Sequence, residues 1–528
     1  MFKDSLTAGC LPKNEKANCR IVEELCQPLL LDIETLNKIK ELFLKDLKMG
    51  LGRKTNVQAV VKCFLTYVQK LPTGCEKGRC LVLDLGGSNF RVMLMTLDGQ
   101  MKYKITDKKF KFPEHLLQGS GQNLFNYVAE CLSNFVKNLN LHMEELPLAF
   151  SFAFPIRQHG LHKGELVGWG KNFNIPDVVS RNVVELLQAA VERRGEIKIS
   201  TYVLMNDTTA VLMSCAFTHR YSKIGVIVDN GCNACYLEQV KYITTFQDPK
   251  TIPTIPTMII NTEWAFFGDN GSLDFVRSKW DMEIDELSST KAQRTFEKMV
   301  SGLYLGPLVR LIILECIKTG VLLQGVTTLE LEKVDSFKTS YIFDIESQCT
   351  GCHYITREIL HILGYGNPTN EDCDCVRFIC EVISRRSADL VAATLACLID
   401  RIGDPFVTVA IDGNIFRCHS HYEKYLLEKL RKLVKTEHKF ELIVSEAGTG
   451  CGAALVAIGV AKHYKDVEKR KSRFTYNNEA NAKANGKVLN QKRRVCKQFN
   501  GRVKLIKRFK VNKVSASRQQ IQQCKNNR

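Results

Sequence analysis

Two short segments of the chain combine an acidic residue, a glycine turn and an asparagine. Asp84 stands two residues before a Gly-Gly-Ser-Asn turn at 86–89, and Asp229 opens an Asp-Asn-Gly-Cys-Asn segment at 229–233. A glycine turn exposes backbone N–H groups, which can hold phosphate oxygens without a side-chain charge. The carboxylate of Asp84 beside such a turn could hold Mg²⁺ through water. A plain tight turn would have the same sequence, because glycine pairs alone are a weak signal.

A third acidic residue is placed for proton transfer. Asp207 lies in an Asn-Asp-Thr segment directly after the apolar run at 201–205. An acid at the carboxyl end of a strand commonly faces the cleft of an α/β protein, where it can remove a hydroxyl proton as a general base. A helix N-cap uses the same residue types, and the local sequence leaves both interpretations open.

Three further side chains suit a sugar. Hydroxyl groups of a sugar need bidentate acceptors and amide donors, which Glu263, Glu297 and Asn233 would supply. Taken singly, each of the three is more often a surface residue or a cap.

Competing nucleotide motifs are missing from the sequence: no G-x-x-x-x-G-K-[ST] exists, and no G-x-G-x-x-G stands out after a strand. A P-loop or Rossmann enzyme is therefore disfavoured.

The elements that must position these residues follow a repeated pattern. An apolar run at 81–83 ends in Asp84, turns, and restarts at 90–94, which indicates a β-hairpin. A near-copy runs from 225–228 through Asp229 to 234–237. The repetition predicts two related halves, each offering one hairpin turn to a shared cleft. Coincidence between two unrelated hairpins is the alternative.

The rest of the chain alternates between helical and strand patterns, which predicts an α/β protein. Asp32 is expected to cap a helix that ends at Gly50 and Gly52, and the glycine-rich segment 448–452 is expected to open a last helix at 453–464. Helices are also predicted at 20–50, 56–69, 123–140, 181–194, 293–321 and 376–402, and strands at 147–153, 201–205, 257–262 and 406–411.

The length of the chain predicts two lobes, and its charge distribution sets apart a basic tail. Its 528 residues exceed one ordinary core, so two lobes are expected. The net charge is +18, and residues 465–528 carry 20 basic and 3 acidic residues, so +17 belongs to this tail. The tail lacks apolar periodicity and is predicted to be disordered. It either contacts polyanions such as nucleic acid or an acidic membrane surface, or is solvated without a fixed partner.

The 21 cysteines have two interpretations. In a reducing cytosol they are small buried hydrophobic residues. The pairs Cys349/Cys352 and Cys373/Cys375 could instead hold a structural zinc ion, although the second pair lacks zinc-finger spacing. Ordinary thiols are the favoured interpretation.

The sequence has no apolar stretch of transmembrane length and no signal-peptide pattern, so an intracellular, cytosolic protein is expected.

Assembled in order, these segments resemble the hexokinase family over residues 20–465. The match is specific because seven segments agree jointly. They are Leu83 to Val92, Leu166 to Phe173, Val203 to Thr208, Asn233 to Tyr236, Glu263-Trp264, Phe296 to Met299, and Asp412-Gly413.

The resemblance implies a two-lobed α/β protein with the actin-like ATPase, ribonuclease H-like duplicated fold. It implies MgATP-dependent phosphorylation of a hexose, with glucose expected, at the 6-hydroxyl, without a prosthetic group. Asp207 would be the general base. The sugar would be held by Asn206, Lys171, Asn233, Glu263, Glu297 and Phe154. The nucleotide would be held by Asp84, Gly86, Gly87, Ser88, Asn89, Arg91, Gly231, Thr339, Asp412, Gly413 and Asn414, with Asp84 also holding Mg²⁺ through water.

The implied organisation has four parts. Residues 1–19 form a flexible N-terminus, 20–75 with 210–449 the large lobe, 76–209 with 450–464 the small lobe, and 465–528 the basic tail. A monomer is expected. Its partners would be hexose and ATP.

The chain also departs from the family pattern. Ser and Thr hydroxyls of the sugar loops are lost at Ala153 and Gly170, each worth about 0.5–1.5 kcal/mol of hydrogen bonding. On the nucleotide side, Asp229 adds a negative charge that would repel a triphosphate, and Cys451 replaces a lysine. Asn230 and Asn414 are altered as well. Two hypotheses follow: a working hexokinase with weakened ATP affinity, which is favoured, or a non-catalytic relative that binds sugar as a sensor or partner protein.

Overall fold

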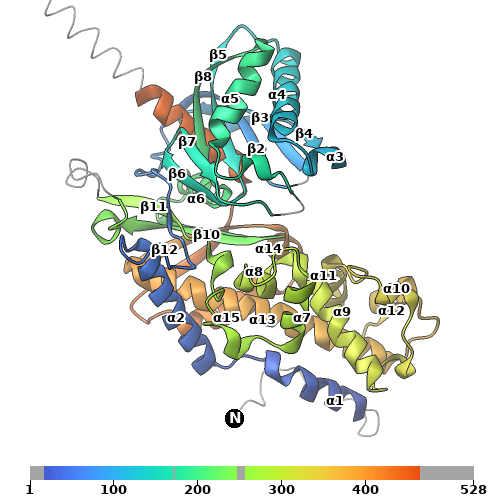
Figure 1. Ribbon diagram of the computed structural model, residues 1–528. Coiled ribbons are helices and arrows are strands. Elements are labelled where there is room, and N and C mark those ends of the chain that lie inside the picture. Colours follow the sequence, from blue (N-terminus) through green and yellow to red (C-terminus); the bar gives the residue numbers. More distant parts are fainter. Residues whose placement is uncertain (1–16, 88, 171–172, 247–255, 447, 464–528) are drawn as a thin grey trace, which may run out of the picture. The chain divides into compact units, whose positions relative to one another are not determined.

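The computed structural model describes residues 17–87, 89–170, 173–246, 256–446 and 448–463 (Figure 1). The chain up to Ala461 clusters into one compact unit. The predicted basic tail lies outside the described residues, as does the N-terminus up to residue 16. In the part of the chain that the structure describes, no helix is both long and apolar enough to cross a membrane.

Two mixed sheets of equal topology form the framework. The N-terminal sheet has the order β4-β3-β2-β5-β8, and the C-terminal sheet has the order β11-β10-β9-β12-β13, with β1 added at its β11 edge. In each sheet the first three strands are antiparallel neighbours and the last two join in parallel. Order and strand sense agree position by position, so the two hairpins seen in the sequence belong to two related halves.

The strands of the N-terminal sheet are β2 (Lys77–Leu85), β3 (Asn89–Asp98), β4 (Tyr103–Lys111), β5 (Glu145–Phe152) and β8 (Lys198–Met205). Those of the C-terminal sheet are β1 (Phe64–Leu65), β9 (Ser222–Val228), β10 (Cys232–Gln239), β11 (Thr257–Asn261), β12 (Phe406–Asp412) and β13 (Lys439–Val444). A separate two-stranded ribbon pairs β6 (Ile156–Gly160) with β7 (Lys163–Leu166).

Fifteen α-helices, besides a final one, connect and cover these strands among the described residues. They are α1 (Ala17–Cys26), α2 (Ile33–Leu51), α3 (Glu114–Leu117), α4 (Gly121–Asn138), α5 (Val183–Arg194), α6 (Asp207–Ala216), α7 (Lys279–Leu287), α8 (Thr295–Val300), α9 (Gly302–Lys318), α10 (Leu329–Glu332), α11 (Thr339–Ser347), α12 (Tyr354–Ile362), α13 (Asn370–Ile402), α14 (Asn414–Cys418) and α15 (Tyr422–Leu433). The final helix occupies 448–463. Short 3₁₀ turns are η1 (Gln27–Leu29), η2 (Pro176–Val178), η3 (Val240–Tyr242), η4 (Trp264–Phe266), η5 (Asp274–Val276) and η6 (Leu323–Gly325).

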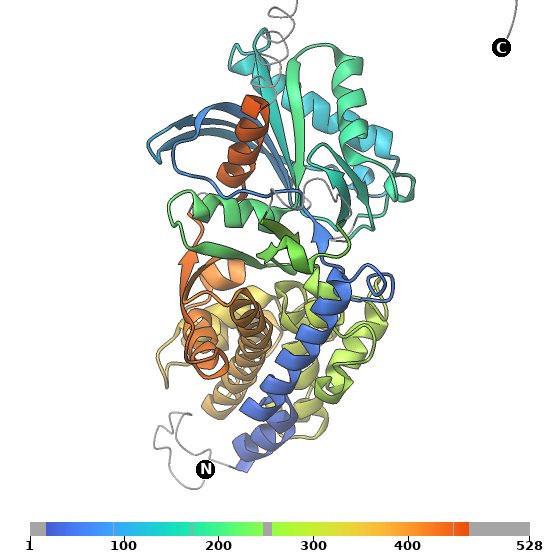
Figure 2. The same ribbon diagram turned by 90° about the vertical axis from the view of Figure 1, so that its left-hand side faces the viewer.

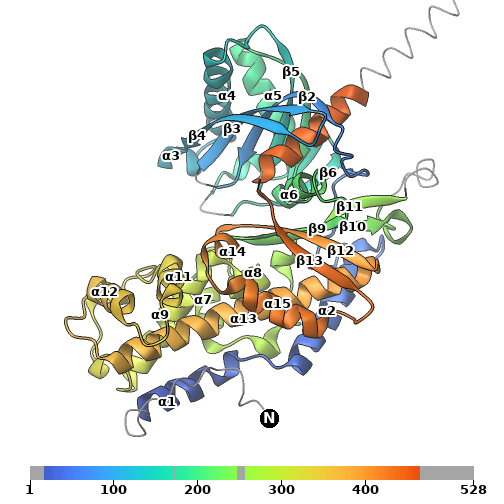
Figure 3. The same cartoon turned by 180° about the vertical axis from the view of Figure 1, so that it is seen from behind.

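Each sheet is covered on both faces. Helices α4 and α5 lie on one face of the N-terminal sheet, and the final helix, red in Figures 1 and 2, lies on the other. Helix α6 packs on one face of the C-terminal sheet, while α2, α13 and α15 cover the opposite face, as Figure 3 shows from behind. The apolar residues of α6 and of the final helix share one buried cluster with β2, β3 and β8.

Several predicted elements are confirmed with small shifts of their ends. Asp32 caps α2 as expected, because its side chain accepts a hydrogen bond from the Thr35 backbone N–H at 2.7 Å. Gly50 lies inside α2 rather than at its end, which is the C-cap residue Gly52. The helix predicted at 376–402 begins earlier, at Asn370, because Thr369 and Asp372 form a capping box there.

Three predictions about helices were wrong. Residues 56–69 form turns and strand β1, because this β-branched segment pairs with β11 and the Thr66 hydroxyl bonds to the Ile259 carbonyl at 2.7 Å. The helix predicted at 293–321 is split into α8 and α9 at Ser301, whose ψ of 154° is extended. The final helix begins at 448 instead of 453, so Gly450 and Gly452 lie within it, and Gly448 at its start is left-handed with φ of 58°. Gly452 lies against the Ala210 carbonyl, where a Cβ atom has no room.

The cysteine pairs do not assemble into a metal site. Cys349 and Cys352 are exposed, whereas Cys373 and Cys375 are buried on α13. Cys375 has its sulfur 3.2 Å from that of Cys19 on α1. Among the described residues, no group of three or more His, Cys, Asp or Glu side chains is placed to hold a metal ion.

Candidate active site

The turn between β8 and α6 fixes the predicted general base. Strand β8 ends at Met205, and Asn206 is the N-cap of α6, its side-chain oxygen accepting from the Thr208 N–H at 3.0 Å. The capping role therefore belongs to Asn206, and Asp207 is the first helical residue. Its carboxylate also accepts from the Thr208 N–H at 2.9 Å, and it lines a cavity of about 280 Å³.

A chain of amides connects this turn to Glu263. The Asn233 side chain donates to the Asn206 side-chain oxygen at 3.4 Å and to that of Asn261 at 2.8 Å. Asn261 in turn donates to Glu263 Oε1 at 2.8 Å. Glu263 itself is 4% exposed and has a left-handed backbone with φ of 53°. Such a backbone is uncommon for a residue other than glycine.

The second glutamate is fixed by two donors. Glu297 Oε2 accepts from the Cys232 backbone N–H at 3.1 Å, at the start of β10. Its other oxygen pairs with the Arg294 guanidinium at 3.1 Å. Both side chains are about nine-tenths buried, with exposures of 12% for Arg294 and 10% for Glu297. The sequence analysis did not identify Arg294, although it stands one helical turn before Glu297.

Burial sets the electrostatics of this region. It raises the pKa of Glu263 to about 7, opposed by the hydrogen bond from Asn261 and the charge of Arg294, and assisted by the charges of Asp207 and Glu297. Carboxyl groups in one cavity disfavour each other's ionised form, and the Arg294 guanidinium partly offsets this effect at Glu263.

The first hairpin turn meets the final helix at the opposite side of the cavity. The Thr449 hydroxyl donates to Asp84 Oδ2 at 2.7 Å, which joins two residues 365 positions apart. A Cβ atom added at Gly86 would meet nothing within 4 Å, so this turn presents open backbone to the cavity. An open turn beside a carboxylate has the donors and the acceptor that a metal-bound phosphate requires.

The second hairpin turn meets the end of β12. Asp229 Oδ1 accepts from the Asn414 backbone N–H at 3.3 Å, and Asp412 pairs with Arg417 at 2.7 Å. Gly413 has a φ of 117° and lies against the Val228 carbonyl, so only glycine fits there. Arg417 brings a cation to this side that sequence reasoning missed. Cys451, where the family pattern has lysine, is fully buried among apolar residues.

One cavity gathers most of the residues singled out in the sequence. Those lining it are Asp84, Gly86, Arg91, Phe154, Asn206, Asp207, Gly231, Asn233, Glu263, Glu297, Asp412, Gly413 and Asn414. Ala153 and Asp229 line it too, as do Arg294, Arg417 and Thr449, which the sequence analysis did not assign. Arg294 and Arg417 are close in sequence to Glu297 and Asp412, whereas only packing across the fold brings Thr449 to the cavity.

Five predicted residues are not among the lining residues. Lys171 and Ser88 lie outside the described residues. Gly87 and Asn89 belong to the first turn and the start of β3 without lining the cavity. Thr339 joins α9 to α11, since its hydroxyl donates to the Gly302 carbonyl at 2.5 Å and accepts from the Gly306 N–H at 2.9 Å. Their assigned roles stay predictions.

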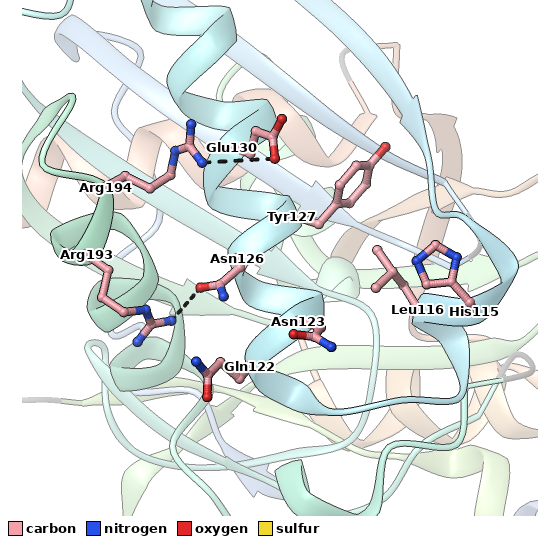
Figure 4. A pocket seen from close by; sticks show the side chains of 9 residues that line it. All are labelled: His115, Leu116, Gln122, Asn123, Asn126, Tyr127, Glu130, Arg193 and Arg194. Atoms are coloured by element: carbon pink, nitrogen blue, oxygen red, sulfur yellow. Dashed lines mark hydrogen bonds and ion pairs between the residues drawn. The ribbon is translucent and has the colours of Figure 1, made fainter.

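A second hollow, of about 490 Å³, lies beside α4 and the end of α5 (Figure 4). Its two arginines are already bonded, Arg193 to Asn126 at 2.6 Å and Arg194 to Glu196 at 3.0 Å. Its lining side chains are mostly exposed. This hollow shares no residue with the cavity around Asp207 and favours no particular ligand class.

Comparisons with known proteins agree with this geometry. Two sequence profiles described as hexokinase match residues 21–217 and 223–459. A solved hexokinase from Schistosoma mansoni, complexed with glucose, is 34% identical with a TM-score of 0.80, over 84% of this chain and 99% of that one. The chain belongs to the hexokinase family. Another solved hexokinase, 26% identical over 84% of this chain and 99% of that one, has a TM-score of 0.71. The predicted hexokinase resemblance and duplicated actin-like fold are thereby confirmed.

Curated members of the hexokinase family are longer. Human Hexokinase-2 is 39% identical over 444 residues, which are 82% of this chain and 47% of the relative. Human Hexokinase-1 is 36% identical over 464 residues, or 86% of this chain and 50% of the relative. The chain therefore spans about half the length of the curated hexokinases it matches.

Proposed function

We propose that this chain transfers the γ-phosphoryl group of ATP to the primary hydroxyl of a hexose, with glucose as the expected substrate. The observation that carries the proposal is the cavity around Asp207. Carboxylates and amides that can bind sugar hydroxyl groups line one part of this cavity, and the open glycine turn beside Asp84 lines another. Transfer of a phosphoryl group to a hydroxyl group requires this arrangement: a general base that lies close both to sugar-binding carboxylates and to a turn that can bind phosphate.

In this proposal Asp207 removes the proton of the primary hydroxyl as its oxygen attacks phosphorus. Asn206, Asn233, Glu263 and Glu297 hold the other hydroxyl groups, because their hydrogen-bond chain presents amide donors and carboxylate acceptors in fixed directions. The backbone of the first turn and the Arg91 side chain hold phosphate oxygens. The lobe boundaries, at about 76, 210 and 450, also stay part of this proposal.

The residues present fit a magnesium ion. Asp84 would hold it through water, with its carboxylate oriented by Thr449 at 2.7 Å. When bound, Mg²⁺ supplies charge neutralisation to the triphosphate. On the altered nucleotide side, Arg417 pairs with Asp412, and Asp229 accepts a hydrogen bond from the Asn414 backbone N–H.

We also propose a cytosolic monomer. The buried free thiols of the described residues suit a reducing compartment. Contact between the basic tail and polyanions stays a prediction, since residues 465–528 lie outside the described part of the chain.

The test is a coupled assay for hexose 6-phosphate with saturating MgATP and a panel of hexoses. We expect turnover, with glucose among the accepted sugars. Glucose-dependent thermal stabilisation without turnover would instead identify the non-catalytic sugar-binding relative. If no hexose gives turnover and none stabilises the protein, both the kinase proposal and the sugar-binding alternative are contradicted.

The raised pKa of Glu263 predicts a pH dependence of sugar affinity. A buried carboxyl whose pKa is about 7 takes up a proton as the pH falls, and the neutral form is a poorer acceptor for hydroxyl groups. We expect the hexose KM to rise below pH 7, approaching about tenfold per pH unit. The measurement is KM between pH 5.5 and 8.5. Glu263→Gln should have a higher KM that no longer changes with pH, and an unchanged profile in this variant would assign the titration elsewhere.

A further inference from the structure

Arg294 places a cation inside the carboxylate-lined cavity. Its backbone is left-handed, with φ of 60°, and the Asp269 carboxylate holds its N–H at 3.0 Å and that of Thr295 at 2.8 Å. This brace fixes the residue at the start of α8 independently of its side chain. The guanidinium then extends to Glu297 at 3.1 Å and to the Trp169 carbonyl at 3.4 Å.

Gly170 makes room for this guanidinium. A Cβ atom added at Gly170 would lie 3.0 Å from Arg294 Nη2 and 3.2 Å from both Cζ and Nη1. These separations are tighter than ordinary contacts, so a larger side chain at position 170 requires the guanidinium to shift by a few tenths of an ångström or more. The family pattern has a threonine hydroxyl at this position. The missing hydroxyl and the guanidinium therefore belong to one region, a neighbouring hollow of about 650 Å³ that Gly170, Arg294 and Glu297 line.

We propose that Arg294 and Gly170 form a coupled exchange, in which the guanidinium replaces the missing threonine hydroxyl as a hexose-binding donor and sets the sugar specificity. This inference rests on the proposed hexose kinase function. Arg294 and Glu297 together offer a donor and an acceptor to neighbouring sugar hydroxyl groups. Arg294 would donate to the oxygen of one hydroxyl group, and Glu297 would accept the hydrogen of the next.

A charged donor changes selectivity as well as affinity. Hydrogen bonds from a guanidinium to a neutral oxygen are stronger than those from a hydroxyl. A sugar that lacks the facing hydroxyl forgoes the hydrogen bond to the guanidinium at a nearly buried position, and sites built to bind a hydroxyl reject deoxy analogues strongly. The site should therefore discriminate sharply at one hydroxyl position of the ring.

The experiment is a double-mutant cycle at the two positions. Arg294→Ala removes the donor and should raise the glucose KM and dissociation constant about tenfold, with kcat changed much less. Gly170→Thr alone should also weaken glucose binding, because the new side chain displaces the guanidinium. The double variant Gly170→Thr/Arg294→Ala restores a hydroxyl with room for it, and should recover most of the lost affinity instead of adding the two losses.

Controls separate binding from folding. The melting temperature without sugar reports the fold of each variant, and the Asp269 brace should keep it close to the parent. Arg277→Ala is the matched control, because this arginine is also ion-paired, with Asp274 and Asp285, but does not line the cavity. It should leave glucose affinity unchanged.

A panel of monodeoxyglucoses identifies the hydroxyl that Arg294 reads. Discrimination against one member should shrink about tenfold in Arg294→Ala, and that against the others should stay. Additive losses in the cycle, an unchanged deoxy profile, or tighter glucose binding by Arg294→Ala would each overturn the inference. Glucose binding measured by calorimetry tests this inference independently of the kinase proposal. Non-additive losses of binding without turnover would support the exchange and reject the kinase function. Turnover with additive losses of binding would support the kinase function and reject the exchange.

Discussion

Asp207→Ala should lower kcat for hexose phosphorylation by roughly a hundredfold to ten-thousandfold, the usual contribution of a general base. The loss is specific to chemistry because the Asn206 cap, and not Asp207, holds the start of α6. The α6 fold and the amide chain to Glu263 should therefore persist. Glucose should still raise the melting temperature of the variant.

Asp207→Asn is the sharper companion variant. The amide keeps the shape of the side chain and an oxygen for the Thr208 N–H, but it cannot accept the hydroxyl proton at neutral pH. The two variants should lose similar activity. Near-parent turnover in either one, measured in the coupled assay at saturating MgATP, would remove Asp207 from the mechanism.

Arg386→Met should destabilise the protein by about 3–5 kcal/mol, the cost of leaving a buried charge unpaired. Arg386 donates to both carboxylate oxygens of Asp281, at 2.9 and 2.7 Å, and to the Val276 carbonyl at 2.9 Å. The side-chain exposures are 1% and 2%. This pair joins α13 to the capping box that begins α7.

The neighbouring residue supplies a matched control for this loss. Arg385 pairs with Glu381 one turn away, with side-chain exposures of 24% and 27%, so Arg385→Ala should cost about 1 kcal/mol or less. Thermal unfolding of both variants in the absence of sugar gives the comparison. Replacing Arg386 and Asp281 together by apolar residues should recover part of the stability. Equal losses in Arg385→Ala and Arg386→Met would contradict the argument from burial.

The duplicated topology could be predicted because its signal is local. Each hairpin is encoded by an apolar run, an acidic residue and a turn at 84–89 and 229–233, and the structure gives both hairpins the same neighbours. The segment 56–69 could not be predicted correctly, because a two-residue strand forms only when β11, some 190 residues later, is present to pair with it. The division at Ser301 likewise depends on tertiary context.

The candidate site divides in the same way. Asp207, Glu263 and Asp84 stand at the ends of strands, so their positions follow from the order of elements. Arg294, Arg417 and Thr449 enter the cavity through contacts with Gly170, Asp412 and Asp84. The contacts of Arg294 with Gly170 and of Thr449 with Asp84 join distant segments and have no periodicity or spacing in the sequence, so only the three-dimensional structure identifies them.

The final helix has a consequence for how the chain is made. It covers a face of a sheet whose last strand ends at Met205, and Thr449 bonds to Asp84. On the ribosome, the N-terminal sheet must therefore keep an apolar face open until more than 240 further residues have been added. This half of the fold, and the contact of Asp84 with Thr449, can therefore be completed only after the final helix has been made.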